Sequence, residues 1–124
     1  MIKLTYCLRR KPGMTVEEFQ RYWRETHAPL VEARAEVLGI KRYVQVHTVL
    51  PAVNAALQAR NGGSPEAFDG VAELWWDDLD AFAAASGSPA GRAASRALYE
   101  DERHFIDHAR SPLWMSEEHA MLER

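Results

Sequence analysis

Three stretches of this chain have the sequence pattern of β-strands, and this pattern constrains the fold more than any other feature. Residues 2–8 and 41–50 alternate in side-chain character, and residues 70–76 form a short apolar stretch around Glu73. A period of two places successive side chains on opposite faces of a strand, so each stretch predicts a β-strand. Near the end of the chain, Leu113 and Met115 favour a short fourth strand, although residues 116–118 could instead begin a turn. The chain is therefore predicted to build a small β-sheet.

A long helical region separates the first two predicted strands. Thr15 and Glu18 have the spacing of a capping box, which satisfies the free N–H groups at a helix start. From Phe19 to Val37, apolar side chains recur on one helical face. Gly39 is a suitable residue to end this helix, because glycine adopts the left-handed conformation of a helix C-cap.

Further helical segments lie on either side of the third predicted strand. Residues 52–60 could form a short helix, and residues 61–65 are a loop. Another helix is predicted to begin at residues 77–80, break at residues 87–91 and continue over about residues 92–106.

The order of these elements predicts the class of fold. It is β-α-β, a long loop, then β-α and a final short strand. This is the α+β, ferredoxin-like split βαβ arrangement, with a four-stranded antiparallel sheet and the helices on one face. We expect residues 1–124 to form one such domain.

The composition excludes several classes of function. Hydrophobic residues make up 47% of the chain, charged residues 27%, and the formal net charge is -3. No basic stripe indicates nucleic-acid binding, and no apolar run approaches the roughly 18 residues of a membrane span. The start of the chain lacks the apolar segment of a secretory leader, so we expect a cytoplasmic protein. Cys7, the one cysteine, can form neither an intramolecular disulfide nor a metal motif alone.

A histidine stands where the first helical region is forced to change course. His27 is followed by Ala28 and Pro29. A residue before proline is biased away from the α conformation, and proline has no N–H to donate, so we predict a kink beside the aromatic Trp23. Histidine titrates nearest neutral pH, which suits His27 to proton transfer. The alternative is a buried or capping histidine without chemistry.

A second group of polar residues lies on the predicted strands. Tyr43 and His47 share one side of their strand, and Glu73 stands in the apolar stretch 70–76. A buried carboxylate is costly unless it is paired or faces a wet cavity. If Tyr43 or His47 meets Glu73, these residues would hold a small polar ligand or move its protons. The alternative is a structural hydrogen bond or ion pair at Glu73, for example with an arginine.

Aromatic residues supply further candidates for ligand binding. Tyr6 could donate a hydrogen bond from the first strand or simply pack under the helices. Trp23 and Trp75 could stack on an aromatic ligand, although packing in the core or an interface is the alternative.

The sheet face that the helices leave uncovered is expected to be too apolar to stay in water. We expect Tyr43, Val49, Val71 and Trp75 to lie on it together. A second copy of the chain, a ligand or both would cover it, with a cavity between two sheets.

Cofactor motifs are weak. His104 and His108 are four residues apart on a predicted helix, as in half of a metal site, but no third ligand accompanies them. The pair Gly62–Gly63 does not connect a strand to a long helix as a phosphate loop does. We therefore expect no metal and no cofactor.

Several stretches of the chain match a known family in order, and together they cover nearly all of it. They are Ile2–Leu4, Arg10–Thr15, Glu18–Phe19, Tyr22–Trp23, Thr26–Leu30, Tyr43–Gln45, Phe68–Trp76, Asp101–Asp107 and Glu117–His119. In this combination the chain resembles the EthD-like family of the dimeric α/β-barrel superfamily.

The resemblance implies a ferredoxin-like protomer whose sheet pairs with that of a second copy in a barrel-like homodimer. It also implies a pocket between sheet and helices, near the end of the first helix. By similarity, His27 carries acid–base chemistry and Tyr43 is its pocket partner. Relatives include methylmuconolactone isomerases and fungal polyketide dehydratases. The isomerases use a cysteine on the third strand, where this chain has Glu73–Leu74, which argues against muconolactone isomerisation.

These observations predict a cofactor-independent acid–base enzyme of the isomerase, cyclase or dehydratase type. Its ligand would be a small, apolar, oxygenated compound such as a lactone, an aromatic or a polyketide fragment. Tyr43, His47 and Glu73 would orient this compound around His27, and Tyr6, Trp23 and Trp75 would help to bind it. Two alternatives stay open: a non-catalytic ligand-binding accessory protein of a catabolic pathway, and a cofactor-free monooxygenase.

Overall fold

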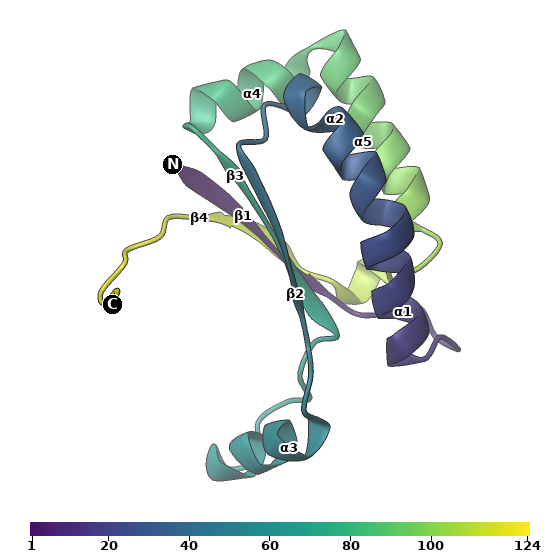
Figure 1. The fold of residues 1–124 in the computed structure, drawn as a ribbon, viewed down its shortest axis with the longest axis vertical. Helices are drawn as coiled ribbons and strands as arrows, with labels where there is room; N and C mark the ends of the chain where they lie inside the picture. The colour runs from purple at the N-terminus through teal and green to yellow at the C-terminus, as the bar shows by residue number, and fades with distance from the viewer.

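The computed structural model describes residues 1–124 and contains one four-stranded antiparallel sheet (Figure 1). Its strands are β1 (Ile2–Leu8), β2 (Arg42–His47), β3 (Gly70–Trp76) and β4 (Leu113–Ser116). They lie in the order β2-β3-β1-β4, so the two central strands come from the two halves of the chain. The predicted ferredoxin-like α+β arrangement is confirmed, including the short final strand.

The main helices cover one face of this sheet (Figure 1). They are α1 (Val16–Tyr22), the π-helical turn η1 (Trp23–His27), α2 (Ala28–Leu38), α4 (Leu79–Gly87) and α5 (Pro89–Glu102). Helix α3 (Pro51–Arg60) instead projects from the end of β2 and buries none of its residues. A short 3₁₀ turn, η2 (His108–Arg110), leads into β4. None of the helices combines the length and apolar character that crossing a membrane requires.

The predicted helix signals at the start of α1 and the end of α2 are confirmed. The backbone N–H of Glu18 donates to Thr15 Oγ1 at 3.0 Å, and the N–H of Thr15 donates to Glu18 Oε1 at 2.9 Å. Gly39 ends α2 with a left-handed φ of 72°. These two signals mark the ends of the helical region that runs from α1 through η1 to α2.

Helix α5 differs from the predicted range of about residues 92–106. It begins at Pro89, because proline suits the first turn of a helix and Ser88 accepts the Gly91 N–H at 2.9 Å. It ends at Glu102, and the chain then turns inward to bury Phe105 and Ile106. The residues after Glu102 are therefore free to reach back towards the sheet.

The hydrophobic core lies between the sheet and the helices, in two clusters. The larger contains Tyr6, Leu8, Phe19, Trp23, Ala72, Phe105 and Ile106. The smaller joins α2 to α5 and contains Val31, Leu38, Ala94 and Leu98. Leu74 packs against both clusters, and members of both line one cavity.

Candidate functional site

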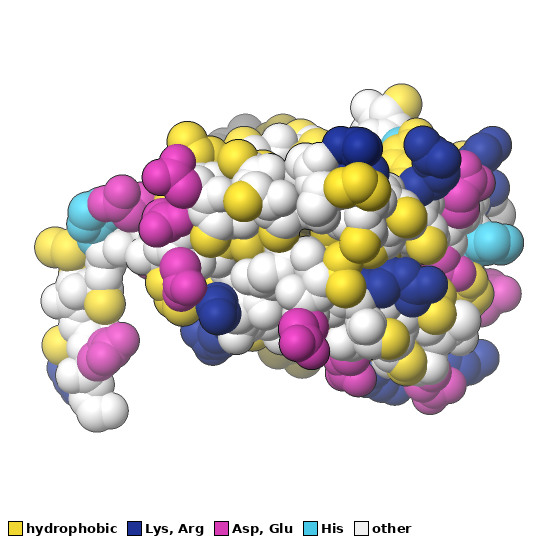
Figure 2. Space-filling view, turned by 90° about the horizontal axis from the view of Figure 1, so that it is seen from above, with side chains coloured by type: hydrophobic (Ala, Val, Ile, Leu, Met, Phe, Trp, Pro, Cys, Tyr) yellow, Lys and Arg dark blue, Asp and Glu magenta, His cyan; other side chains and the backbone are white.

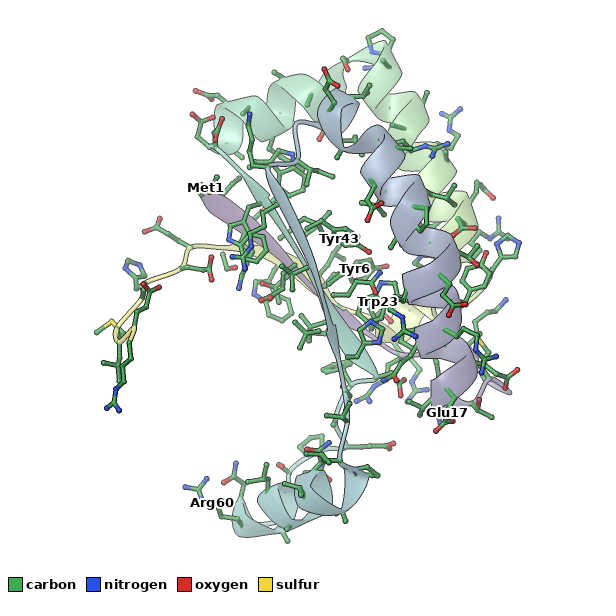
Figure 3. The ribbon with its side chains drawn as sticks, viewed as in Figure 1. Met1, Tyr6, Glu17, Trp23, Tyr43 and Arg60 are labelled. Atoms are coloured by element: carbon green, nitrogen blue, oxygen red, sulfur yellow. The ribbon has the colours of Figure 1, made fainter.

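A cavity of about 510 Å³ lies between the sheet and the helices. Hydrophobic residues make up 16 of its 22 lining residues, which suits a small apolar ligand. Figure 3 shows Tyr6, Trp23 and Tyr43 in the space between the strands and the helical layer. The titratable side chains that line it are Tyr6, His27, Tyr43, Tyr99, Glu102 and His108.

His27 reaches this cavity from a π-helical turn. The backbone N–H of Ala28 donates to the carbonyl of Trp23, five residues earlier, which defines the wider turn. Ala28 itself is α-helical, with φ -54° and ψ -44°, so the predicted departure of its backbone from the α region is wrong. Because Pro29 cannot donate to the carbonyl four residues before it, the helix adapts by widening rather than by breaking. The widened turn carries both Trp23 and His27 inward, where both are buried.

One ring nitrogen of His27 is held by Asp101. Nδ1 of His27 lies 2.7 Å from Asp101 Oδ2, and the Tyr22 hydroxyl donates to Asp101 Oδ1 at 2.7 Å. Burial, assisted by Asp101, raises the pKa of Tyr22 to about 12, so its hydroxyl remains a donor. Because an ionised carboxylate only accepts, Nδ1 carries the proton of the neutral imidazole. Nε2 makes no hydrogen bond within the protein.

A hydrogen-bond chain fixes Tyr43 on the opposite wall. Nε2 of Gln45 donates to the carbonyl of Trp23 at 2.9 Å and to the Tyr43 hydroxyl at 2.7 Å. A carbonyl oxygen can only accept, which sets the orientation of the amide. Oε1 of Gln45 then accepts from Nε2 of His47 at 2.8 Å. The Tyr43 hydroxyl accepts from Gln45, and no protein group accepts its own proton, so it can donate to a ligand.

The environments of Tyr43 and His47 favour their neutral forms. Burial is the main reason that the pKa of Tyr43 is raised to about 12. Burial, with a smaller effect of Arg24, lowers the pKa of His47. The His47 ring stacks on Trp23 with centroids 4.5 Å apart. His47 is not among the residues that line the cavity, and its hydrogen bond links it to Tyr43 through Gln45.

Another carboxylate on α5 joins two further residues of the cavity wall. Oε1 of Glu102 accepts from the Tyr6 hydroxyl at 3.0 Å and lies 3.1 Å from Nε2 of His108. Burial, followed by Glu102, raises the pKa of Tyr6 well above its ordinary value. The Tyr99 ring stacks on His108 with centroids 4.3 Å apart.

Sequence reasoning did not identify Asp101, Glu102 or the role of His108. It grouped His108 with His104 on one helix, which is wrong because α5 ends at Glu102. His104 is exposed, and its Nδ1 lies 3.1 Å from the Asp101 carbonyl. The available signal was the adjacent pair of acidic residues before the apolar Phe105–Ile106, at the end of a predicted helix.

No group of three or more His, Cys, Asp or Glu side chains is arranged to hold a metal ion.

The predicted meeting of Glu73 with Tyr43 or His47 is wrong. Tyr43 pairs in register with Leu74, so the preceding residue, Glu73, points to the opposite face of the sheet. There Glu73 Oε2 binds Lys3 Nζ at 2.7 Å. This is the structural ion pair of the alternative interpretation, with a lysine in place of an arginine.

Trp75 also lies on the face away from the helices. Its ring packs under the charged groups of Lys3 and Arg42, with distances of 5.3 and 4.5 Å to the ring centroid. Its indole N–H donates to Glu118 of the C-terminal segment. The predicted grouping of Tyr43 with Val71 and Trp75 on one face is therefore wrong, and neither Glu73 nor Trp75 lines the cavity.

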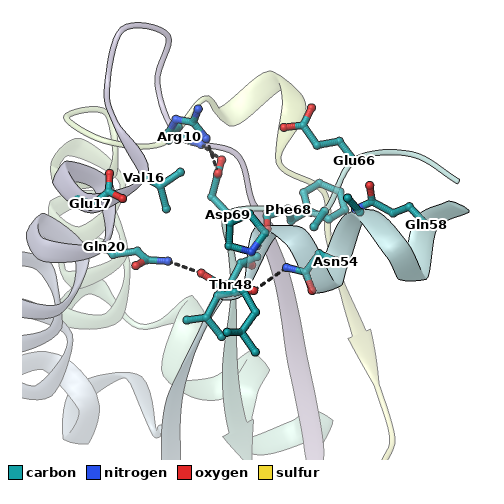
Figure 4. A pocket seen from close by; sticks show the side chains of 15 residues that line it. Arg10, Val16, Glu17, Gln20, Thr48, Asn54, Gln58, Glu66, Phe68 and Asp69 are labelled. Atoms are coloured by element: carbon teal, nitrogen blue, oxygen red, sulfur yellow. Dashed lines mark hydrogen bonds and ion pairs between the residues drawn. The ribbon is translucent and has the colours of Figure 1, made fainter. Parts of the chain in front are cut away.

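A second hollow, of about 550 Å³, lies between α1, α3 and the loop before β3 (Figure 4). Several of its polar groups pair within the protein, whereas the side chains of Glu17, Gln58 and Glu66 line it without such a partner. Arg10 Nη1 binds Asp69 Oδ1 at 2.5 Å, and Gln20 Nε2 donates to the Thr48 carbonyl at 2.8 Å. Asn54 donates to the Val49 carbonyl at 2.6 Å. This hollow is lined by no histidine or tyrosine, whereas the first cavity is lined by both, so the cavity beside His27 is the candidate site.

The fold and cavity together define a ferredoxin-like α+β protein with an apolar hollow beneath its helices. The family model described as "EthD domain" matches residues 11–109 of this chain. The chain therefore belongs to the EthD family, and the resemblance seen in its sequence is confirmed.

Solved structures agree with this assignment. An EthD family protein from Bacillus halodurans is 21% identical, with a TM-score of 0.62, and the match covers 96% of this chain and 99% of that chain. A dimeric protein of unknown function and ferredoxin-like fold from Bacteroides fragilis is 14% identical, with a TM-score of 0.58 and 94% of each chain covered. At these identities the similarity shows the fold.

One curated relative carries a more specific name. It is the "Conidial pigment biosynthesis dehydratase EthD" of Metarhizium robertsii, 43% identical over 47 residues. The match covers 38% of this chain and 33% of that protein, so this chain spans only about a third of the relative's length.

Proposed function

We propose that this protein is a cofactor-independent acid–base enzyme that moves a proton on the carbon next to a carbonyl group. Its substrate is a small, apolar, oxygenated compound such as a lactone, an aromatic or a polyketide fragment. The observation that carries this proposal is His27. The residue is only 5% exposed, Asp101 holds Nδ1, and Nε2 is unpaired at the wall of an apolar cavity.

The proposed first step uses His27 and Tyr43. Nε2 of His27 removes a proton from the carbon next to the carbonyl, and the Asp101 carboxylate stabilises the resulting imidazolium. The Tyr43 hydroxyl donates a hydrogen bond to the carbonyl oxygen as negative charge develops there. The apolar walls lower the polarity around His27 and Tyr43 and so strengthen both interactions. Tyr6 and Trp23 shape the cavity, and His47 keeps Tyr43 in place.

The fate of the enolate would distinguish the reaction types. Return of the proton to another carbon gives isomerisation, attack on a second carbonyl gives cyclisation, and departure of a neighbouring hydroxyl gives dehydration. The dehydratase name of the Metarhizium robertsii relative supports chemistry of this general kind, as does the family of the chain. The cytoplasm is the proposed site of action.

We also propose a homodimer in which a second copy covers the open face of the sheet. Val46 and Trp114 lie on this face and are 44% and 49% exposed. Helix α3 projects from the body and exposes Val53 and Leu57. Figure 2, a view from the end where α4 and α5 meet, shows hydrophobic side chains interspersed with charged ones and the C-terminal residues extending to one side. The dimeric relative from Bacteroides fragilis supports this assembly.

Proton exchange in deuterium oxide tests the proposed activity. Lactones and aryl ketones are incubated with the protein, and NMR follows exchange of the protons next to the carbonyl. The wild-type protein should accelerate exchange, and His27→Gln should reduce it by roughly 10²–10⁴-fold without loss of binding. Equal exchange by both proteins would contradict the role of His27. Tight binding without any exchange would favour the accessory role, and turnover only with dioxygen would favour the oxygenase.

A further inference from the structure

The cavity contains a second histidine whose ring is held by a carboxylate. Asp101 and Glu102 are consecutive at the end of α5, and each binds a different histidine. Asp101 holds His27, from the helical layer, and Glu102 holds His108, from the turn that leads into β4. Both histidines line the same cavity. The single-base reaction proposed above leaves His108 unused.

The hydrogen bonds of Glu102 define the state of His108. Oε1 of Glu102 already accepts the Tyr6 hydroxyl, and a carboxylate oxygen can accept a second hydrogen bond. Nε2 of His108 is therefore the donor at 3.1 Å. Its Nδ1 has no partner in the protein. His108 thus presents one free ring nitrogen, as His27 does.

The two histidines differ in their access to water. The side chain of His27 is 6% exposed and that of His108 is 23% exposed. A residue that must be reprotonated between turnovers benefits from such access, and a base that works on a carbon acid benefits from a dry site. The two positions therefore suit different roles.

We propose that His108, oriented by Glu102, is the acid that protonates a leaving hydroxyl, so that the reaction is the dehydration of a β-hydroxy carbonyl compound. This inference rests on the proposed function. Isomerisation returns a proton to carbon and needs only one base, whereas hydroxide is a poor leaving group that departs much faster when an acid protonates it as the C–O bond breaks. A cavity with two separate proton-transfer residues fits the second requirement.

The step balances without an oxidant or reductant. The C–H bond next to the carbonyl breaks, and its proton passes to Nε2 of His27. The electron pair forms the C=C bond as the C–O bond to the β-hydroxyl breaks. The departing oxygen takes a proton from Nδ1 of the His108 imidazolium and leaves as water. His27 then loses its proton and His108 regains one from solvent.

Two probes with the same carbon skeleton separate the steps. Benzylacetone has no β-hydroxyl, so deuterium exchange next to its carbonyl reports only on His27. The aldol adduct of benzaldehyde and acetone carries the β-hydroxyl, and its loss of water to benzylideneacetone is followed by ultraviolet absorbance. His108→Gln should slow water loss by roughly 10²-fold or more relative to exchange. His27→Gln should slow both.

A positioning variant and a control complete the experiment. Glu102→Gln retains the size of the side chain and should also slow water loss more than exchange, which keeps the test available if His108→Gln does not fold. His119→Gln changes an exposed histidine that pairs with Glu117, far from the cavity lining, and it controls for surface charge. Water loss by His108→Gln at the wild-type rate would overturn this inference, yet leave the proposed function standing if exchange still depends on His27. A wild-type protein that catalyses neither reaction would overturn both.

Discussion

Nδ1 of His27 lies 2.7 Å from Oδ2 of Asp101, across 74 residues of sequence. The second oxygen of the same carboxylate accepts from Tyr22, so Asp101 is held from two sides and cannot rotate freely. The His27 ring also packs against Phe105 with centroids 5.0 Å apart. One carboxylate at the end of α5 therefore sets both the orientation and the tautomer of the imidazole at the π-helical turn.

Replacing Asp101 tests this control of the tautomer. Asp101→Asn keeps the size of the side chain, but its amide can donate to Nδ1 and so favour the wrong tautomer of His27. We expect kcat to fall by roughly 10²–10⁴-fold with a smaller change in KM. Nitrogen NMR of the imidazole should show the proton moving from Nδ1 to Nε2. Glu100→Gln, an exposed change one residue earlier on α5, is the matched control, and an equal loss of activity in that variant would contradict the prediction.

Tyr43 offers a test of carbonyl polarisation. Tyr43→Phe keeps the ring in the cavity wall and removes only the hydroxyl that accepts from Gln45. If that hydroxyl stabilises charge on the carbonyl oxygen, kcat should fall by about 10²–10³-fold. Steady-state kinetics and the thermal midpoint should be measured together, because the unpaired Gln45 donor also weakens the fold slightly. An unchanged kcat would show that Tyr43 only shapes the cavity.

The proposed dimer makes a prediction about the open sheet face. Val46 lies on that face beside Val71, so Val46→Glu places charges where two copies would meet. Sedimentation equilibrium should show a dimer for the wild-type chain and a shift to monomer for this variant. Val37→Glu is the matched control, because Val37 is 45% exposed on α2, in the layer that covers the other face. A wild-type monomer at all concentrations would exclude the dimer.

The sequence predicted the individual helices and strands of this fold better than the contacts between them. The capping box at Thr15, the stop at Gly39 and the range 70–76 of β3 follow from local patterns, and the structure agrees with all three. Local patterns carry this information because capping and strand alternation involve residues a few positions apart.

The candidate site depends on contacts between residues that are far apart in the sequence, and no local pattern predicts such contacts. The strand pattern shows that Tyr43 and Glu73 each lie in a β-strand. Whether their side chains share one face of the sheet is set by the register of β2 against β3. A shift of one residue would have brought them together. Likewise, the contact between His27 and Asp101 depends on how α5 packs across the sheet. The sequence could thus propose His27, but not the partner that holds it.

The lowered pKa of His47 predicts a pH dependence of stability. Burial disfavours the charged ring in the folded state, so the folded protein binds fewer protons than the unfolded chain, whose histidine pKa is about 6.5. The stabilising contribution is fully present above that value and is lost as the pH falls through the lower folded pKa. Urea unfolding over this range should show a declining free energy of unfolding. His47→Gln should make the decline shallower, and an unchanged decline would assign it to other groups.

Gly70 tests how closely the π-helical turn rests on the sheet. A Cβ at this position would overlap the ring of Trp23 and lie 2.9 Å from the carbonyl oxygen of Val46. Because a backbone oxygen on β2 cannot yield easily, Gly70→Ala should displace Trp23 and cost about 1–3 kcal/mol of unfolding free energy. The displacement would also disturb the stacked His47 and the Gln45 bond to the Trp23 carbonyl, so kcat should fall as well. Gly87→Ala is the matched control: a Cβ there meets no atom within 4 Å, and stability should be equal or slightly higher. If both variants unfold at the same urea concentration as the wild-type protein, the packing of Trp23 does not require close contact with β3.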